Sequence, residues 1–552
     1  MDGNGLLTKI ADVGWEGPGE DEGRDCIPYT ENEDESHRIF RAEAEALKAE
    51  ALQKGLSVKI QEDPFFNSYV TLEGYSPRKV AICSHLDSVP HGGRYDGVLG
   101  VASGLDILKK FIDDGEIPNI SVQVIAFRSE ESSVTGKSCL GSRLATGNYE
   151  VDELRGLMHR VLDKSIYEIL EDRGTNGQEL DDYSRTPFIN HELLHAVIEF
   201  HVEQSGVLDS CDVPFGIVIH GVGGARRSKV LIESLDGKNC EIKNGKILKG
   251  TVRGTAGHSG GTPMNGEIIG GNVTRLRKDA LLAVSKFLQK LNVRGLVSIS
   301  VPDGSYNVIP ALCEFELCVP GDRDVGFFEN VLQQVLEDGM SASVEFLSKE
   351  NVDIECIREN VSAAAMDVIC DCESIVGKTA VETNGQVRAT IGNIVKTERG
   401  ITLLMDQRRL NNDVADVVAE SVCDRLNVLM QMHDGVDIHE EDVGTSLATS
   451  FIGPLQNLMR RIYSETYGSV PIEMGSMPGH DISSLISSTM DGAVPGGMVF
   501  VRGRNGGISH HPSEYSSEED IAAAKDFLFK VVKSIVMSGE PKAFPRTGRK
   551  SA

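Results

Sequence analysis

The residues that decide the fold are VAICSHLDSVPHGGRYDGVLGV, residues 80–101. The apolar start of this stretch predicts a buried strand that ends near His85, and a helix is expected over residues 99–114. Other short apolar runs, LSVKI, YVTLEG and VQVIAF, lie to either side of it. Such runs alternating with helices predict a mostly parallel sheet with helices on its faces, and these sheets bind ligands beyond the carboxyl ends of their strands.

Composition narrows the possible partners of this chain. It has 552 residues, with 55 Lys and Arg against 83 Asp and Glu, and a formal net charge of −28. The acid surplus argues against a broad surface for nucleic acid or for an anionic membrane. No apolar run approaches the roughly 18 residues that span a bilayer, and a signal peptide is not expected. The 11 cysteines are scattered, which favours reduced thiols in a cytoplasmic protein.

The middle third of the sequence contains two successive units of helix, strand, strand, helix and strand. The first begins with a helix over residues 276–291 and the second with a helix over residues 360–377. Their order suggests an internal duplication, although two unrelated α+β modules would give the same pattern. We therefore predict an α/β catalytic domain, residues 1–221 and 435–552. An α+β lid domain interrupts it, with lid units over residues 222–350 and 351–434.

Polar residues that can bind metal follow the predicted strand ends. His85 closes the strand VAICS, and Asp87 two residues later can orient its ring. Asp96 lies in a Gly-rich loop that lets the backbone approach an ion. A histidine with a nearby aspartate is a weak signal, and a lone strand-end histidine is more often structural.

Further candidates lie at other strand ends and loops. Glu130 and Glu131 follow the strand VQVIAF, His201 closes AVIEFHVEQ, and His510 lies in GGISHHPSE. Adjacent acids are usually a solvated turn, but one can bind a metal while the other handles protons. Together with His85 and a bridging Asp96, these side chains form a complete ligand set for two borderline metal ions.

Seven motifs in one order resemble the hydantoinase/carbamoylase family, within the dinuclear zinc exopeptidase and aminoacylase superfamily. They are HLDSVPHGGRYDGVLGV, SEES…GS, EFHVEQSGVL, GHSGGTPM, NVIP, GHD and GGISHHPSE. The resemblance implies a zinc-exopeptidase-like catalytic domain with a mixed, mostly parallel sheet. The HVEQ segment favours the amidohydrolase branch.

The resemblance also implies a role for each matching residue. By position, the metal ligands are His85, Asp96 as the bridge, Glu131, His201 and His510. The general base is Glu130. Asp87 orients His85, and Gln204 and His480 lie near the substrate. His511 beside His510 is a competing ligand. The implied cofactors are two divalent ions, Zn²⁺ or Mn²⁺, with Co²⁺ and Ni²⁺ as alternatives, because His and carboxylate ligands suit all four.

The lid departs from the family pattern. His258 and Asn307 match the family residues that hold the oxyanion and grip the substrate, but the expected arginine position holds Pro320. Arg408, in the second lid unit, matches that arginine, whose planar fork suits a carboxylate. Arg408 as a surface residue of an amphipathic strand is the alternative. If both lid units serve one site, a single chain is complete, which favours a monomer over the homodimer.

The implied reaction is hydrolysis of a linear carbamoyl or ureido amide on a small carboxylate, such as an N-carbamoyl-amino acid or allantoate. A dipeptidase or aminoacylase of the same superfamily is the nearest alternative. An inactive scaffold on this fold is the third, and the complete ligand set argues against it.

Overall fold

The computed structural model divides into two compact units. Unit 1 comprises Met1–Val222 and Thr449–Ala552, and unit 2 comprises Gly223–Ala448. The structure describes residues 3–19, 22–237, 240–269, 272–275, 277–292, 295–302, 304–306, 308–319, 323–347, 352–451, 453–486 and 494–538.

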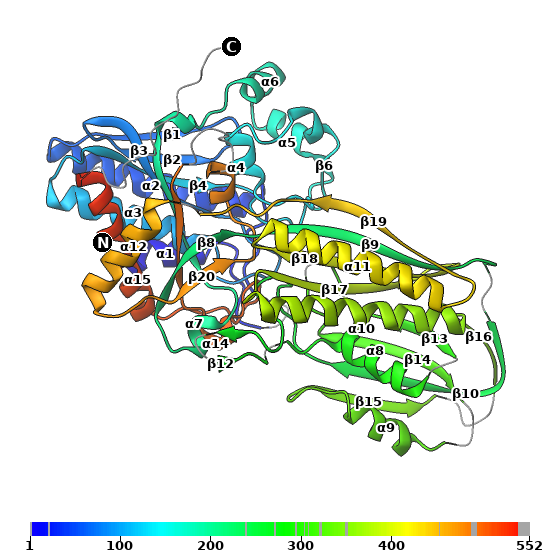
Figure 1. Cartoon of the computed structure of the whole chain (residues 1–552). Coiled ribbons are helices and arrows are strands. Elements are labelled where there is room, and N and C mark those ends of the chain that lie inside the picture. The colour runs from blue at the N-terminus through cyan, green and yellow to red at the C-terminus, as the bar shows by residue number, and fades with distance from the viewer. Residues whose placement is uncertain are drawn as a thin grey trace, which may run out of the picture. The chain divides into compact units, whose positions relative to one another are not determined.

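Unit 1 is built on a mixed sheet of eight strands (Figure 1). In spatial order these are β1 (Val58–Glu62), β2 (Ser68–Leu72), β4 (Ile120–Phe127), β3 (Ser76–His85), β7 (Leu194–Val202), β21 (Gly496–Val501), β8 (Phe215–Val222) and β20 (Glu473–Ser476). The four central strands, from β4 to β21, are parallel to one another. Their carboxyl ends therefore lie at one edge of the sheet.

Helices bury the apolar strands of this sheet. The main core includes side chains from α1 (Gly3–Ala11), α2 (Glu31–Gln53), α3 (Val98–Asp114), α12 (Pro454–Tyr467) and α15 (Glu518–Ser538). A second core includes α4 (Leu140–Ala145), α5 (Ile166–Asp172) and α6 (Gly177–Arg185). Helix α3 lies close to β7, because a Cβ on Gly100 would be 2.1 Å from the carbonyl oxygen of Phe200.

Short elements complete unit 1. They are β5 (Met158–His159), β6 (Lys164–Ser165), α7 (Val207–Ser210), α13 (Ile482–Ile486) and α14 (Arg504–Gly507). None of the helices within the described residues is long and apolar enough to cross a membrane.

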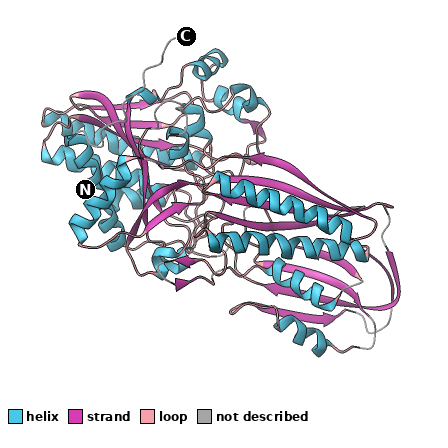
Figure 2. Cartoon of the chain, viewed as in Figure 1, coloured by secondary structure: helices cyan, strands magenta, loops and turns pink. Residues whose placement is uncertain are grey.

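Unit 2 contains two principal sheets with helices packed against them (Figure 2). The first has the order β13 (Leu296–Ser300), β14 (Leu312–Val319), β10 (Cys240–Arg253) and β15 (Ser341–Phe346), and β16 (Val352–Cys356) also pairs with β10. The second has the order β17 (Val387–Lys396), β18 (Gly400–Arg409), β9 (Gly224–Ser234) and β19 (Val436–Thr445). The helices are α8 (Ala280–Leu291), α9 (Val325–Gln333), α10 (Glu359–Glu382) and α11 (Asn412–Met432), and β11 (Ile268–Ile269) pairs with β12 (Asn272–Val273).

The two sheets of unit 2 share one topology. Each half reads strand, helix, strand, strand, helix, strand, and the first strand of each lies between its third and fourth. The halves are nested, because β9 precedes the whole first half yet pairs with β18 and β19 of the second. A duplication as the origin of this likeness stays a prediction.

The boundaries of unit 2 differ from those expected from sequence. Strand β9 lies in the second sheet, although residues 224–234 were assigned to the first lid unit. Strand β19 also belongs to unit 2, so the chain returns to unit 1 at Thr449 and not at residue 435. The expected α/β fold with a mixed sheet, interrupted by an α+β domain, is confirmed.

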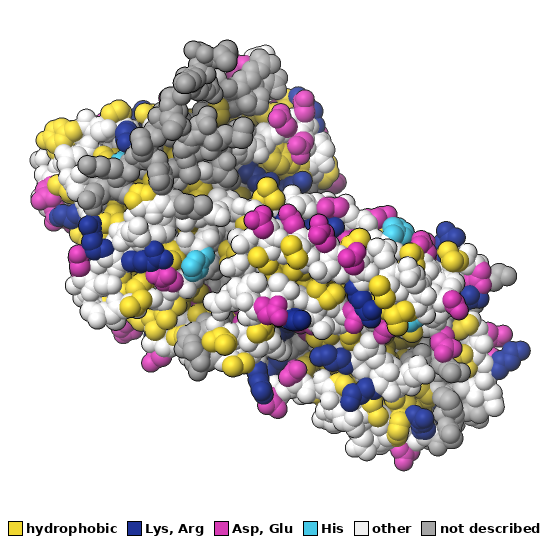
Figure 3. Space-filling model, viewed as in Figure 1, with side chains coloured by type: hydrophobic (Ala, Val, Ile, Leu, Met, Phe, Trp, Pro, Cys, Tyr) yellow, Lys and Arg dark blue, Asp and Glu magenta, His cyan; other side chains and the backbone are white. Residues whose placement is uncertain are grey.

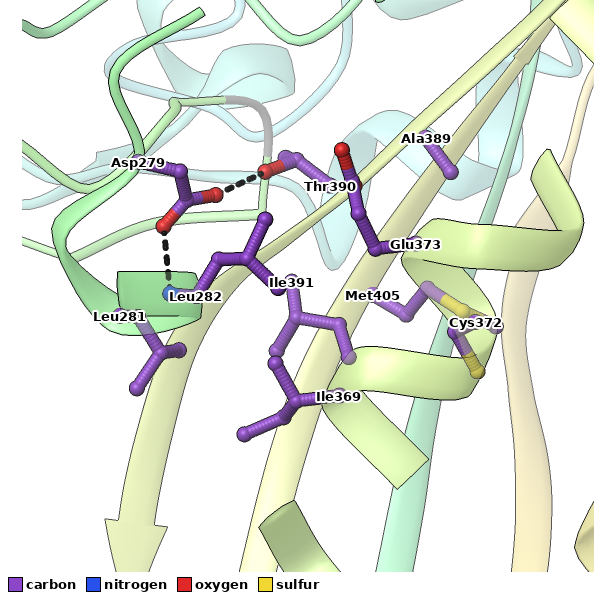
Figure 4. A pocket seen from close by; sticks show the side chains of 10 residues that line it. All are labelled: Asp279, Leu281, Leu282, Ile369, Cys372, Glu373, Ala389, Thr390, Ile391 and Met405. Carbon is purple, nitrogen blue, oxygen red and sulfur yellow. Dashed lines mark hydrogen bonds between the residues drawn. The ribbon is translucent and has the colours of Figure 1, made fainter. Parts of the chain in front are cut away.

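Two acidic side chains face a small cavity inside unit 2 (Figure 4). Asp279 begins α8 and accepts a hydrogen bond from the Leu282 N–H at 3.0 Å. Burial raises the pKa of Asp279 to about 7. Burial also raises the pKa of Glu373 on α10, and Arg277 opposes this shift. The cavity belongs to the core of this unit.

Charged side chains of both signs lie on the surface. On the face shown in Figure 3, Asp and Glu side chains are interspersed with Lys and Arg side chains among the described residues. This mixed pattern is typical of a solvated surface.

Candidate metal centre

The predicted ligands of unit 1 gather at the carboxyl edge of the parallel strands. His85 is the last residue of β3, and His201 is next to the last residue of β7. Glu130 and Glu131 follow β4, and His510 follows β21. The edge expected from sequence is therefore where these side chains meet.

Asp96 lies at the centre of this cluster. One carboxylate oxygen of Asp96 is 3.0 Å from His201 Nε2 and 3.5 Å from His85 Nε2. The other oxygen is 3.2 Å from His510 Nε2, which is also 3.2 Å from a Glu131 oxygen. The described side chains form four overlapping groups of possible metal donors, and two of them, His85–Asp96–His201 and Asp96–Glu131–His510, share Asp96. His510, and not His511, faces this centre.

The ring orientations suit metal binding. His85 Nδ1 is 3.1 Å from the Asp87 carbonyl oxygen, and His201 Nδ1 is 2.9 Å from that of Val202. A carbonyl oxygen only accepts, so each Nδ1 carries an N–H, and Nε2 is the ring nitrogen that faces the centre. Histidine ligands of metal ions usually donate their other ring N–H in this way.

The charges and the unpaired oxygen of the centre also fit a cation. Asp96 Oδ1 is buried and has no hydrogen-bond partner among the described residues. Burial alone would raise the pKa of Asp96, but the surrounding histidines, His201 foremost, hold it well below its usual value. Burial would lower the pKa of His510, yet Glu131 and Asp96 raise it well above the ordinary value. Buried carboxylates whose ionised form is stabilised by nearby positive charge can provide the donors of a metal site.

Glu130 differs from its neighbour Glu131. Burial raises the pKa of Glu130 well above its usual value, Glu131 adds to this shift, and His85 opposes it. A buried carboxylate with high proton affinity, next to a metal-binding group, is suited to accept a proton.

Two buried carboxylates hold the backbone that carries both glutamates. Asp87 accepts hydrogen bonds from the Glu130 N–H at 3.1 Å and the Glu131 N–H at 2.9 Å. Glu33 on α2 accepts one from the Ser129 N–H at 3.2 Å, and Ser129 has a left-handed φ of 52°. Asp87 therefore positions this loop in addition to lying 3.5 Å from His85 Nδ1. Glu33 was missed from sequence, because it lies in an acid-rich helix with no local motif.

Glu514 is a further residue that sequence reasoning missed. It accepts hydrogen bonds from the Tyr95 N–H at 2.8 Å, the Asp96 N–H at 3.0 Å and the Ser509 hydroxyl at 2.8 Å. Gly93 is required nearby, since a Cβ there would lie 2.3 Å from the Glu514 carboxyl group. Glu514 thereby links the Asp96 loop to the His510 loop. Its place at the end of GGISHHPSE was the available signal.

The two residues expected near the substrate in unit 1 lie beside the ligands. Gln204 donates a hydrogen bond to Asp96 at 2.9 Å and lies 3.5 Å from His510 Nε2. His480 is buried against His201, with ring centroids 4.6 Å apart, and its Nε2 is 2.7 Å from the Ser476 hydroxyl. Burial lowers the pKa of His480 well below its usual value, and His201 adds to this.

The predicted lid residues lie within unit 2. His258 Nδ1 accepts hydrogen bonds from the N–H groups of Gly260 at 3.2 Å and Gly261 at 3.0 Å. A neutral His258 therefore carries its proton on Nε2, as an oxyanion donor requires. Its backbone also pairs with Val308, the second residue of NVIP. Asn307 lies outside the described residues.

Arg408 is close to the His258 loop. Arg408 Nε donates to Asp406 at 2.6 Å, and Asp406 also accepts a hydrogen bond from the Ser259 hydroxyl. Arg408 is 6% exposed, so it is not the surface residue of the alternative interpretation. The first half of unit 2 carries His258, and the second half carries Arg408.

An ion pair between the halves supports this contact. Arg388 on β17 donates to both carboxylate oxygens of Glu267, at 2.9 and 2.8 Å. The same guanidinium donates to the carbonyl oxygens of Gly260 and Gly261, the second at 3.3 Å. Bidentate pairs of this kind fix geometry well, so the His258 loop is attached to the second half.

The fold and this donor set define a hydrolase of the metal-dependent α/β class. The chain belongs to peptidase family M20/M25/M40, whose family model matches residues 81–534.

The names of proteins that are similar in sequence to this chain agree with this family. The chain is 24% identical to allantoate deiminase of Arabidopsis thaliana over 464 residues, 83% of this chain and 70% of that protein. It is 24% identical to N-carbamoyl-L-amino acid amidohydrolase of Geobacillus stearothermophilus over 484 residues, 86% of each. A solved amidase of the hydantoinase/carbamoylase family from Burkholderia multivorans has the same fold, with a TM-score of 0.57, 20% identity and coverage of 97% and 98%. The resemblance expected from sequence is confirmed.

Proposed function

We propose that the chain is an amidohydrolase that cleaves a linear carbamoyl or ureido C–N bond of a small carboxylate. N-carbamoyl-amino acids and allantoate-like compounds are the substrate class, as the names of its relatives suggest. The observation that carries the proposal is the pair of donor groups that share Asp96, with the buried Glu130 beside them.

The donor groups favour two divalent ions per chain, Zn²⁺ or Mn²⁺, held by His85, Asp96, Glu131, His201 and His510. Such ions lower the pKa of water and polarise a carbonyl. Asp96 would be the ligand that both ions share, because each of its oxygens faces a different set of donors.

Glu130 moves the proton in this proposal. Its carboxylate takes a proton from the attacking water and holds it while the C–N bond breaks. It then returns the proton to the leaving nitrogen. Hydrolysis of a terminal carbamoyl group gives the free amine, ammonia and carbon dioxide. The buried surroundings that raise the pKa of Glu130 favour its protonated form between these steps.

Unit 2 supplies substrate contacts in this proposal. His258 donates its Nε2–H to the carbonyl oxygen as negative charge develops. Arg408 and Asn307 bind the substrate carboxylate, for which a planar guanidinium is well suited. Because both halves of unit 2 belong to one chain, we propose a self-sufficient monomer. We also propose that it is cytoplasmic, since its cysteines are scattered.

One experiment separates the competing functions. The purified chain is loaded with Zn²⁺ or Mn²⁺, its metal content is measured, and ammonia is assayed with N-carbamoyl-amino acids, allantoate and dipeptides. Ammonia release from the first two supports the proposal. Release of amino acids from dipeptides alone would show a dipeptidase, and a metal-loaded chain with no turnover would show a scaffold.

A further inference from the structure

Cys139 makes two hydrogen bonds to Glu130. Its thiol donates to a Glu130 carboxylate oxygen at 3.1 Å, and its backbone N–H donates to the Glu130 carbonyl oxygen at 2.8 Å. The residue is 5% exposed. Among the described residues, this thiol is the one hydrogen-bond donor to the Glu130 carboxylate. The contact therefore bears on the side chain that moves the proton.

The backbone holds Cys139 in place. Cys139 has a left-handed φ of 55°, just before α4. The next two N–H groups, of Leu140 and Gly141, donate to the carbonyl oxygens of Ser129 at 2.9 Å and Arg128 at 3.1 Å. Gly141 has no room for a Cβ, which would lie 2.3 Å from the Arg128 oxygen. The thiol is thus presented by a segment that is itself fixed to the Glu130 loop.

The opposite side of the loop is also fixed. Glu33 and Asp87 accept its successive N–H groups, while the segment from Cys139 to Gly141 donates to its carbonyl oxygens. These bonds fix the main chain of residues 128–131 but leave the χ angles of Glu130 free. The thiol is the contact that selects one carboxylate orientation.

A thiol suits this task because it is a weak donor. A lysine or arginine at the same place would favour the carboxylate charge and reduce its proton affinity. A thiol restrains one oxygen while the other stays available to water. The general base keeps its reactivity and loses rotational freedom.

We infer that Cys139 is a positioning residue that acts through Glu130, holding its carboxylate in the orientation that accepts the proton. The inference rests on the proposed function of Glu130. Nothing in the motifs of the sequence pointed to this cysteine, since its partner is set by the left-handed turn before α4.

The kinetic test compares Cys139→Ala with Cys139→Ser on a carbamoyl substrate at matched metal content. We expect kcat to fall about tenfold in Cys139→Ala, the scale of one lost hydrogen bond, with KM changed less than about twofold. Cys139→Ser retains most of kcat, because its hydroxyl also donates. The control is Cys313→Ala, which removes another buried thiol, in unit 2, and should keep wild-type kcat. An unchanged kcat in Cys139→Ala, or equal losses in the alanine and serine variants, would overturn the inference.

A second readout does not depend on turnover. The S–H stretching band of Cys139 is identified in the infrared spectrum as the band lost in Cys139→Ser. In Glu130→Ala, this band should move to higher wavenumber, because the thiol loses its acceptor. A band at the same position in both proteins would show that the hydrogen bond is absent. If the wild-type chain releases no ammonia but the band shifts, the proposed function fails while the thiol contact stands.

Discussion

Glu130 and Glu131 are adjacent in sequence but contact different partners. A Glu131 oxygen faces His510 Nε2 at 3.2 Å, whereas a Glu130 oxygen accepts from the Cys139 thiol. Successive side chains after a strand point in different directions, so one can bind a metal while the other transfers protons. Replacing Glu130 should therefore affect proton transfer, and replacing Glu131 should affect metal binding.

Glu130→Gln should keep its metal and lose turnover. Glutamine preserves the shape of the side chain but cannot take a proton, and general base help is worth about 100- to 10,000-fold. We expect kcat to fall by that range, measured at metal content equal to wild type. The control is the exposed Glu153→Gln, which should match wild type. Full activity in metal-replete Glu130→Gln would remove Glu130 from the mechanism.

Asp96→Ala should lose both ions. Asp96 is the one residue shared by the two donor groups, so its removal leaves each with two donors. Metal analysis after dialysis should find close to no bound ion, and the exposed Asp152→Ala should keep the wild-type content. Two ions retained per chain in Asp96→Ala would show that it is not the bridge.

At the scale of elements, a buried acid at the start of α8, Asp279, lowers the free energy of unfolding when it ionises. The pKa of Asp279 is about 7 in the folded chain, against an ordinary value of 3.8. Between about pH 4 and pH 7, the unfolded chain loses this proton while the folded chain keeps it. The contribution of Asp279 therefore becomes more destabilising as the pH rises through this window, and the cost persists above pH 7.

Asp279→Asn should be more stable than wild type at pH 8. Asparagine still caps α8 but never ionises, so the variant gains on wild type as the pH rises from 4 to 8. We expect Tm to rise by about 2–4 °C at pH 8, with little change at pH 4. The matched control is Asp324→Asn, at the exposed start of α9. A difference in Tm that does not depend on pH would contradict the interpretation.

At the scale of the whole molecule, the nested halves of unit 2 bear on assembly. His258 and Arg408 come from different halves, and Asp406 contacts both Ser259 and Arg408 within one chain. This arrangement supports the proposal of a self-sufficient monomer.

Mixing two inactive variants tests the monomer. His258→Ala is expected to lose about 100-fold in kcat or more, as loss of an oxyanion donor does. Arg408→Ala is expected to lose most of its kcat/KM, because the substrate carboxylate loses its guanidinium partner. After mixing and re-equilibration, no activity should return at any ratio. Complementation, or a dimer that persists at nanomolar concentration with His258 facing the metal centre of the other chain, would show that the sites are shared between chains.

Sequence periodicity located elements of this chain that are long and regular. The predicted helix over residues 360–377 lies within α10. The predicted ligands lie at strand ends or in the loops that follow them, at the edge of the sheet. The pairing of β9 could not be predicted, since apolar alternation does not state which distant strand is the partner. Glu33 was missed for a similar reason, because its contacts join segments that no local motif connects. Cys139 lies within the stretch SEES…GS, but at a position that the motif does not specify.

The nested topology also sets an order of folding during synthesis. Glu233 on β9 pairs with Gly400, and Val436 pairs with Ser234, so the outer sheet stays incomplete until the ribosome has passed residue 436. The inner sheet needs only the chain up to β16. Long-range pairing is slow, and domains fold as they emerge. The inner half is therefore complete while β9 is still an unpaired edge, and the nascent chain must keep that edge from associating until β18 arrives.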